Sequence, residues 1–479
     1  MKGGGEIPLP DARTPPPGRG SRPTRLWDVV VIGNDLPGLV AAALLAKRGL
    51  RILHVDHGAP HDRHTSGGFR LQSLPMPSPL PRASRSLHAV AEELGVLPMI
   101  GRSMAPFPGG LQILLPSARI ALPPSADARA AELARAFGAA GPGLAREVER
   151  LRALADRAAG LFEDAPPLPA SGLLERWKAS RFIGRATGEL GPVAGGSPLL
   201  LAIASLHRLS SRLEGGPSAL DFSRATAPWL FEPARPPDGG FVSMLRASIR
   251  GHRGDTLGEP DAPERIEEVS IERGRFAGIR LEGQGAIHRG RIGLVACPLG
   301  AIAPLIAAPR LRAALERFDE RLPAERHVAT WNFVLSEEAI PPGLGELAAV
   351  AGDDGEVTLL EREPARDEDG RIASGLVAVK ASRIAADEVE AKRRVDAALE
   401  EAMPFHERHL RHQARAPSRQ AVHRAPDGRA PATLPIRSPV SRLLVGNAAI
   451  LPGFGLEGTF LAGGRIAALA AEAVARVKL

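Results

Sequence analysis

The chain has 479 residues, 44% hydrophobic and 24% charged, and its 61 basic and 54 acidic side chains give a net charge of +7. This length predicts two or three domains, because one domain holds roughly 100 to 200 residues. The composition is typical of a globular protein, and the absence of a basic stripe interleaved with aromatic residues argues against nucleic-acid binding. The single cysteine, Cys297, excludes an intrachain disulfide, and its apolar neighbours predict a buried core residue.

The first 25 residues are rich in proline, glycine and arginine and contain no apolar run like the core of a signal peptide. We expect a disordered tail there. No uninterrupted apolar run in the sequence reaches the roughly 18 residues that a membrane span needs. The expected location is therefore the cytoplasm.

From Trp27 the sequence predicts a βαβ unit. "WDVVVIG" reads as a strand buried on both faces, followed by a helix from about Pro37 to Lys47 and a second strand, "RILHVD". Gly33 allows a tight turn at the end of the first strand, and Gly38 lets the helix pack against the sheet. Asp56 ends the second strand, where an acid would hydrogen-bond an adenosine ribose, unless it merely begins a turn.

Asp35 stands where this fingerprint normally has its middle glycine, which lets the backbone approach a pyrophosphate. Two charges about 4 Å apart repel by roughly 4 kcal/mol at an effective dielectric near 20, against ~12 kcal/mol for nanomolar binding. Repulsion alone would therefore weaken dinucleotide binding without abolishing it. The side chain could instead point away, or cap the helix just ahead of Pro37 and take the N–H bonds of a phosphate. The sequence leaves these alternatives open.

The middle of the chain predicts a helical insert of the kind found in substrate or cap domains. Residues 109–124 read as two short strands, and residues 127–162 as amphipathic helices broken near "GPG". Further on we expect a helix after residue 237, a β-hairpin over 264–283 and a buried strand over 290–302. Segments 329–340, 355–363 and 374–384 read as strands of an exposed antiparallel sheet. The chain ends in a strand, a glycine-rich loop and a long helix.

Residues 28–56 and 443–471 resemble the two ends of the FAD-dependent phytoene desaturase and amine oxidase superfamily, and "PGFGLEG" at 452–458 is most similar to its phytoene dehydrogenase branch. The resemblance implies an α/β fold: a Rossmann-like FAD-binding domain of the GR2-type flavoprotein fold with a discontinuous α+β substrate or cap domain. The FAD-binding domain would comprise residues 26–100, 236–308 and 437–479. The cap domain would comprise residues 101–235 and 309–436.

The resemblance also implies where FAD would be held. Ile266 falls where a hydrophobic residue flanks the adenine. Gly446 and Asn447 fall beside the flavin chain, although the family commonly has an acid at the position of Asn447. Gly455 and Gly458 leave backbone N–H groups free at the start of the last helix, whose positive end favours a reduced flavin.

The family's "GGR" motif appears here as "GGFR", with Gly68 and Arg70. Arg70 either pairs with the pyrophosphate and offsets Asp35, or is one more surface arginine. With the glycines and acids above, these two residues complete the set of FAD-binding candidates.

Two groups of histidines and Lys380 give no specific indication of function. Four histidines, at 54, 57, 61 and 64, are expected in an exposed linker rather than in a metal site, and we predict no metal ligands. Histidines 406, 409 and 412 are expected to drift around a helix. Lys380 interrupts an apolar strand, and we expect it at the edge or on a face of the sheet.

Two functions remain open. The first is an FAD-dependent oxidoreductase that removes hydride from an apolar, isoprenoid or lipid-like substrate held in the cap domain. No catalytic side chain can be named for it. The second is a non-catalytic relative with a degenerate cofactor site that binds a lipid or protein partner, as the Rab GDP-dissociation inhibitors do on this fold. A lipid ligand would suit transient contact with a membrane surface, although no amphipathic anchor stands out in the sequence.

Overall fold

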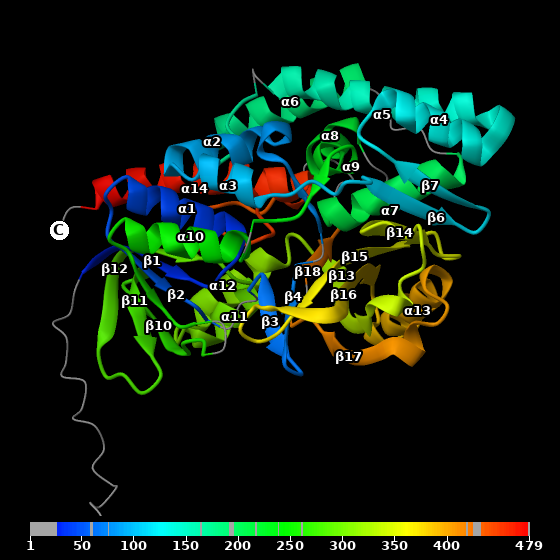
Figure 1. The fold of residues 1–479 in the computed structure, drawn as a ribbon. Helices are drawn as coiled ribbons and strands as arrows, with labels where there is room; N and C mark the ends of the chain where they lie inside the picture. The colour runs from blue at the N-terminus through cyan, green and yellow to red at the C-terminus, as the bar shows by residue number, and fades with distance from the viewer. Residues whose placement is uncertain are drawn as a thin grey trace, which may run out of the picture.

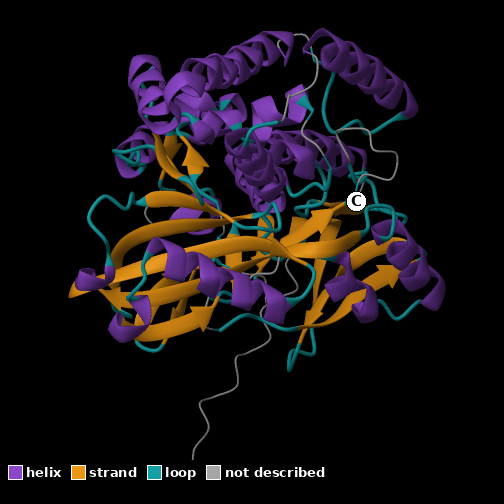
Figure 2. Ribbon diagram, turned by 90° about the vertical axis from the view of Figure 1, so that its right-hand side faces the viewer, coloured by secondary structure: helices purple, strands orange, loops and turns teal. Residues whose placement is uncertain are grey.

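A computed structural model describes residues 26–57, 61–74, 76–162, 165–190, 196–215, 218–237, 239–259, 262–417, 420–424 and 433–477. The predicted N-terminal tail lies outside these residues. Two large sheets and a layer of helices form most of the described part of the chain, which also contains two small two-stranded sheets (Figures 1 and 2).

The first sheet contains the predicted βαβ unit. Its strand order is β10-β11-β12-β1-β2-β9, with β19 beside β12. β1 is parallel to both β2 and β12, and β12 is parallel to β19. β10 and β11 form the predicted hairpin, which turns at Arg273 and Gly274. The strands are β1 (Trp27–Ile32), β2 (Ile52–Val55), β9 (Asp255–Leu257), β10 (Ile266–Glu272), β11 (Arg275–Leu281), β12 (Ile287–Val295) and β19 (Leu443–Val445).

Three helices pack together over this sheet: α1 (Leu36–Lys47), α10 (Gly240–Gly251) and α14 (Gly455–Arg476) (Figure 1). α1 is apolar on every side and buried from Pro37 to Ala46, as expected of a helix enclosed by protein. The segment Pro452–Arg476 is long and apolar enough to cross a membrane by length and composition. More than half of it is buried, and it packs against α1 and β12, so it is a core helix.

The second sheet has the order β17-β13-β16-β15-β14-β6-β7, with β18 beside β13. It is antiparallel, as predicted, except where β14 runs parallel to β6. Its central strands, β13 and β16, are buried over most of their length, so the prediction of an exposed sheet was wrong. The strands are β6 (Leu111–Leu115), β7 (Ala118–Leu122), β13 (Ala324–Ser336), β14 (Leu347–Ala351), β15 (Val357–Arg366), β16 (Ile372–Ala385), β17 (Leu410–Arg415) and β18 (Gln420–His423).

The helical insert forms a layer above both sheets (Figure 2). The predicted break falls between α4 and α5 at Gly138–Ala140. The expected helix around histidines 406, 409 and 412 is instead one short 3₁₀ turn, His406–His409, that leads into β17. The remaining helices are α2 (Arg85–Leu94), α3 (Leu97–Ser103), α4 (Ala126–Phe137), α5 (Gly141–Leu161), α6 (Leu173–Leu190), α7 (Pro198–Ser211), α8 (Ala219–Ala225), α9 (Ala227–Leu230), α11 (Leu299–Ile302), α12 (Pro309–Asp319) and α13 (Glu388–Ala402).

Candidate cofactor site

The turn from β1 into α1 has the tight geometry expected of a dinucleotide-binding loop. Gly33 has a φ of 98°, and a Cβ added there would lie 2.4 Å from the Ala296 carbonyl oxygen. A Cβ on Gly38 would lie 2.4 Å from the Ala296 Cβ and 2.9 Å from the Gly446 oxygen. Both glycines are therefore required by the packing of the turn against the ends of β12 and β19.

Asp35 does not cap helix α1, which was one of the orientations that the sequence left open. It precedes α1 but makes no side-chain bond to the first turn of that helix. Its Oδ2 atom instead accepts a hydrogen bond from the Ala448 N–H at 3.0 Å, in the loop that follows β19. Burial raises the pKa of Asp35 to about 6, against the lowering effects of the Ala448 bond and the Arg212 charge. A backbone donor beside the predicted pyrophosphate position thus already holds an anionic oxygen.

Asp56, the predicted ribose acceptor, is fully buried and bonded to two side chains of this chain. Its Oδ2 atom accepts hydrogen bonds from His61 Nε2 and, at 2.8 Å, from Arg246 Nη1 on α10. Burial alone would raise the pKa of Asp56, but the His61 bond and the Arg246 charge hold it below its usual value. The second oxygen, Oδ1, is buried with no hydrogen-bond partner among the described residues.

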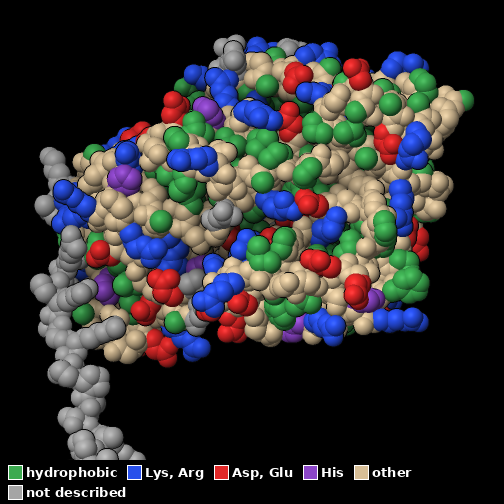
Figure 3. All heavy atoms as spheres, in the orientation of Figure 1, with side chains coloured by type: hydrophobic (Ala, Val, Ile, Leu, Met, Phe, Trp, Pro, Cys, Tyr) green, Lys and Arg blue, Asp and Glu red, His purple; other side chains and the backbone are tan. Residues whose placement is uncertain are grey.

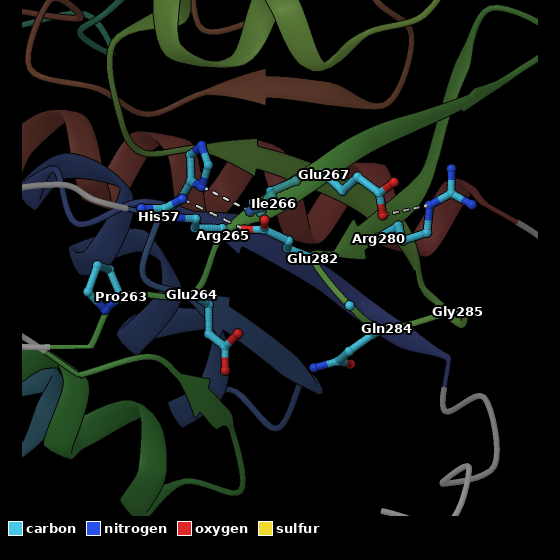
Figure 4. A pocket seen from close by; sticks show the side chains of 11 residues that line it. His57, Pro263, Glu264, Arg265, Ile266, Glu267, Arg280, Glu282, Gln284 and Gly285 are labelled. Carbon is cyan, nitrogen blue, oxygen red and sulfur yellow. Dashed lines mark hydrogen bonds and ion pairs between the residues drawn. The ribbon is translucent and has the colours of Figure 1, made fainter.

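At the predicted adenine position, the Ile266 N–H donates to His57 Nδ1 at 3.2 Å. The His57 ring points toward the start of β10, as Figure 4 shows. Burial lowers the pKa of His57, so the ring is held in the neutral form that can accept this bond. Both residues border an open cavity of about 970 Å³ that is also lined by Glu264, Arg280 and Glu282.

The glycine-rich loop before α14 is covered by α7 and α8. A Cβ on Gly453 would lie 2.7 Å from Leu213 Cδ1, and one on Gly455 would lie 3.0 Å from the Ser210 oxygen. A Cβ on Gly458 would meet the Leu451 oxygen at 2.5 Å. Close packing against neighbouring protein atoms therefore requires glycine at these three positions.

Acidic side chains also lie beside this loop. Glu457, in the first turn of α14, is buried and accepts hydrogen bonds from Ser84 and, at 2.7 Å, from the Ser86 hydroxyl. Asp221 lies beside Gly453, and burial raises the pKa of its carboxyl to about 7. The positive end of α14 thus already has a carboxylate next to it.

Asn447, predicted beside the flavin chain, is bonded within its own loop region. Its Nδ2 atom donates to the Cys297 carbonyl oxygen at 3.3 Å, and its Oδ1 atom accepts from the Ala449 N–H at 3.2 Å. Gly446 is closely packed, because a Cβ there would lie 2.8 Å from Leu294 Cδ1. Cys297 is buried, as predicted.

The structure separates Gly68 and Arg70 from Asp35. Gly68, with a φ of 82°, forms the turn between β3 (Arg63–Ser66) and β4 (Phe69–Gln72). Arg70 Nη1 lies 3.5 Å from the place where a side chain on Gly370 would begin, at the turn between β15 and β16. The charge that acts on Asp35 is that of Arg212. Of the two alternatives for Arg70, its position at this turn favours that of a surface arginine.

The first histidine cluster is part of the fold rather than an exposed linker. His54 is buried in β2, its Nε2 atom lies 3.0 Å from the Gly33 oxygen, and burial lowers its pKa to about 4. His64 Nδ1 lies 3.0 Å from the Ser73 hydroxyl. Within the described ranges, no group of three or more histidine, cysteine or acidic side chains could hold a metal ion.

Lys380 lies on an interior strand, β16, and is buried rather than at an edge. Its Nζ atom donates to Glu361 Oε2 at 2.6 Å and to Gln72 Oε1 at 2.8 Å. The ammonium group is thus held by an ion pair within the second sheet and by a hydrogen bond to strand β4.

Three partners in the site were missed by sequence reasoning: His57, Arg212 and Arg246. Arg246 lies 190 positions from Asp56 in the sequence, and no local spacing relates the two residues. His57 directly follows Asp56, but its bond to Ile266 depends on how β10 lies beside the end of β2.

Several groups predicted to contact FAD are already bonded within the protein. The Ala448 N–H is bonded to Asp35, Asp56 Oδ2 to Arg246 and His61, and the Ile266 N–H to His57. FAD that used the Ala448 or Ile266 N–H would have to compete with these bonds, whereas Asp56 Oδ1 has no partner among the described residues and Ile266 borders the open cavity.

The chain is similar in fold to several solved structures. An oxidoreductase from Methanosarcina mazei matches with a TM-score of 0.59 and 16% identity, over 91% of this chain and 99% of that one. Cyclohexylamine oxidase from Brevibacterium oxydans matches with a TM-score of 0.57 and 16% identity, over 94% and 100%. RAB GDI from Plasmodium falciparum matches with a TM-score of 0.53 and 10% identity, over 88% and 93%.

No family model matches the chain, and no curated protein sequence matches it either. The structural neighbours confirm the predicted α/β class and the Rossmann-like GR2-type flavoprotein fold. Amine oxidases are among these neighbours, whereas the phytoene dehydrogenase branch stays a prediction.

Proposed function

We propose that this chain is a cofactor-free binding protein built on the fold of flavin-dependent oxidoreductases. The hydrogen bond from the Ala448 N–H to Asp35 is the observation that carries this proposal. It links the two loops between which a pyrophosphate would lie, through a side chain that replaces the fingerprint's middle glycine. A phosphate would have to displace a carboxylate from its donor and then lie beside it, which adds a repulsion of several kcal/mol.

The retained glycines do not argue for a cofactor, because protein packing accounts for each of them. Gly33 and Gly38 meet Ala296, and Gly458 meets the Leu451 oxygen. A chain that had lost its cofactor would keep these glycines to preserve its fold. Their presence therefore does not distinguish an enzyme from a binding protein.

The proposed ligand is a lipid or a protein surface, the two kinds of partner expected from the sequence for a non-catalytic relative of this fold. The likeness to RAB GDI shows that this fold is not confined to proteins named as oxidases. Localisation in the cytoplasm remains an expectation from the sequence.

The second candidate is an FAD-dependent oxidoreductase acting on an apolar, isoprenoid-like substrate. It is favoured by the oxidases among the fold neighbours, by the unpaired Oδ1 atom of Asp56 and by the open cavity beside Ile266. In that case the hydrogen bonds that Asp35, Asp56 and Ile266 make within the chain would belong to a closed state, which opens when FAD binds.

A series of variants tests the proposal by equilibrium dialysis against FAD. The unmodified chain should retain no FAD at micromolar concentrations. The double variant Asp35→Gly with His57→Ala should bind more FAD, because it removes one side chain from the predicted phosphate position and one from the predicted adenine position. Asp369→Gly, which changes an exposed acid in the turn between β15 and β16, is the control and should behave as the unmodified chain. Stoichiometric FAD binding by the unmodified chain would reject the proposal in favour of the second candidate.

A further inference from the structure

Helix α6 exposes large apolar side chains on the outer surface of the helical layer. The exposed fractions are 84% for Leu173, 66% for Leu174 and 55% for Trp177. At about 100° per residue these three positions fall within one sector of the helix about 100° wide. The opposite side, with Ala179, Phe182 and Ala186, is buried against the protein. The exposed apolar face is therefore additional to the face that holds α6 in the fold.

Basic side chains surround this face. Arg176, Lys178, Arg181 and Arg185 are all exposed, and the Arg181 guanidinium lies 5.0 Å from the Trp177 ring centre. Figure 3 shows basic side chains, together with hydrophobic and some acidic ones, along the upper edge of the molecule, where α6 lies in Figure 1.

The acid described on this helix is turned toward the protein. Glu175 accepts a hydrogen bond from Arg465 Nη2 of α14 at 2.6 Å and from the Ser171 N–H at 2.7 Å. The Ser171 bonds and the Arg465 charge lower its pKa to about 2, so it stays ionised and paired. It therefore does not neutralise the outward cations.

We propose that the exposed face of α6 docks on a membrane surface that contains anionic lipids. An interfacial helix has tryptophan and leucine on one side and lysine or arginine around them, which is the arrangement found here. Leu173, Leu174 and Trp177 would enter the boundary between headgroups and acyl chains. The four cations would meet the lipid phosphates, to which each contributes attraction near the surface.

Charge favours a membrane over a second copy of the chain. Two α6 faces brought together would place four cations against four others, with Glu175 of each helix already bonded inward. An anionic lipid surface complements the same charges. A lipid surface would be a partner of the proposed binding protein, but α6 would dock in the same way whether or not the chain holds flavin.

Tryptophan fluorescence gives a site-specific measurement of docking. The chain has four tryptophans, and three of them, Trp27, Trp229 and Trp331, are 5% exposed or less. A blue shift on addition of vesicles would therefore report Trp177. We expect the full chain to co-sediment with phosphatidylcholine vesicles containing phosphatidylglycerol, with a blue shift, and to bind pure phosphatidylcholine far more weakly.

Variants separate the two contributions. Leu173→Ser with Leu174→Ser should weaken binding at least tenfold, and Arg176→Gln, Lys178→Gln and Arg181→Gln together should weaken it on the order of 100-fold. Trp177→Phe should bind but lose the blue shift. The matched control is Phe405→Ser, because Phe405 is 63% exposed and has Arg408 over its ring at 5.7 Å, on another part of the surface.

Several results would overturn the proposal: no sedimentation with either vesicle, equal binding to both, or equal loss in the Phe405 control. Self-association that the same α6 variants abolish, without vesicle binding, would assign the face to a second copy instead. Because none of these measurements uses FAD, failure of docking and failure of the cofactor-free proposal can be told apart.

Discussion

Asp35 stands at the position of the middle glycine of the dinucleotide-binding motif. Its carboxylate is bonded to Ala448, which lies 413 positions further along the chain. The sequence showed the substitution but not its partner, because Ala448 is brought near only when β19 pairs with β12. The same holds for Asp56 and Arg246, which join β2 to α10. Residue types at motif positions could be predicted from the sequence, whereas their bonds depend on the tertiary arrangement.

Asp35→Asn tests the charge at this position. The folded pKa of about 6 lies above the ordinary 3.8, so the folded state binds more protons than the unfolded state between these values. The ionised form therefore costs stability above pH 6, and this cost disappears as the pH falls below about 4. Asparagine can still accept the Ala448 bond, so we expect a gain of about 1 to 3 kcal/mol at pH 8.

Urea unfolding at two pH values measures this effect. The Asn variant should unfold at higher urea than the unmodified chain at pH 8, and the difference should vanish near pH 4. Equal midpoints at pH 8, or a gain that persists near pH 4, would show that Asp35 is not destabilised by its charge.

The pair of Asp56 and Arg246 predicts strong coupling. Removing Arg246 by Arg246→Met leaves the buried Asp56 carboxylate without its arginine partner and should cost about 3 to 5 kcal/mol. Asp56→Asn together with Arg246→Met should cost much less than the sum of the single changes. Unfolding midpoints of the four proteins in the cycle measure the coupling, and additive effects would mean that the pair is not a buried ion pair.

At the scale of elements, the packing of α1 against α14 joins the first and last motifs of the chain. The pattern of apolar and glycine residues predicted both helices and the strands that precede them. It did not predict that β6 and β14 pair in parallel, or that residues 410–415 form a strand, because those pairings are made with strands distant in the sequence. The alternation of exposed and half-buried residues in β17 was obscured in the sequence by its histidine and two arginines.

Two adjacent glycines of α14 test this packing. A Cβ on Gly463 would lie 2.4 Å from Val40 Cγ1 and 3.0 Å from the Pro37 oxygen, whereas a Cβ on Gly464 would meet nothing within 4 Å. Gly463→Ala should therefore destabilise the chain by about 1 to 3 kcal/mol. Gly464→Ala should stabilise it by about 0.5 to 1 kcal/mol, because alanine favours a helix. Thermal unfolding of both variants measures the difference, and equal effects would contradict the close approach of the two helices.

At the scale of the whole molecule, three segments far apart in the sequence build the first sheet, and the second sheet combines strands from the helical insert and from residues 324–423. The resemblance of the chain ends was enough to predict the fold class. It could not establish whether the cofactor site is open, because that depends on contacts from α7, α8 and α10, which belong to neither motif. In this chain, knowing the fold class therefore does not establish whether the cofactor site is open.

The most direct measurement is the visible absorbance spectrum of the unmodified, purified chain after incubation with excess FAD and removal of the free cofactor. We expect a colourless protein, because Asp35, Asp56 and Ile266 are already bonded to partners within the chain. Flavin bands that remain with the protein at equimolar intensity would contradict it and would show that these bonds open to admit the cofactor.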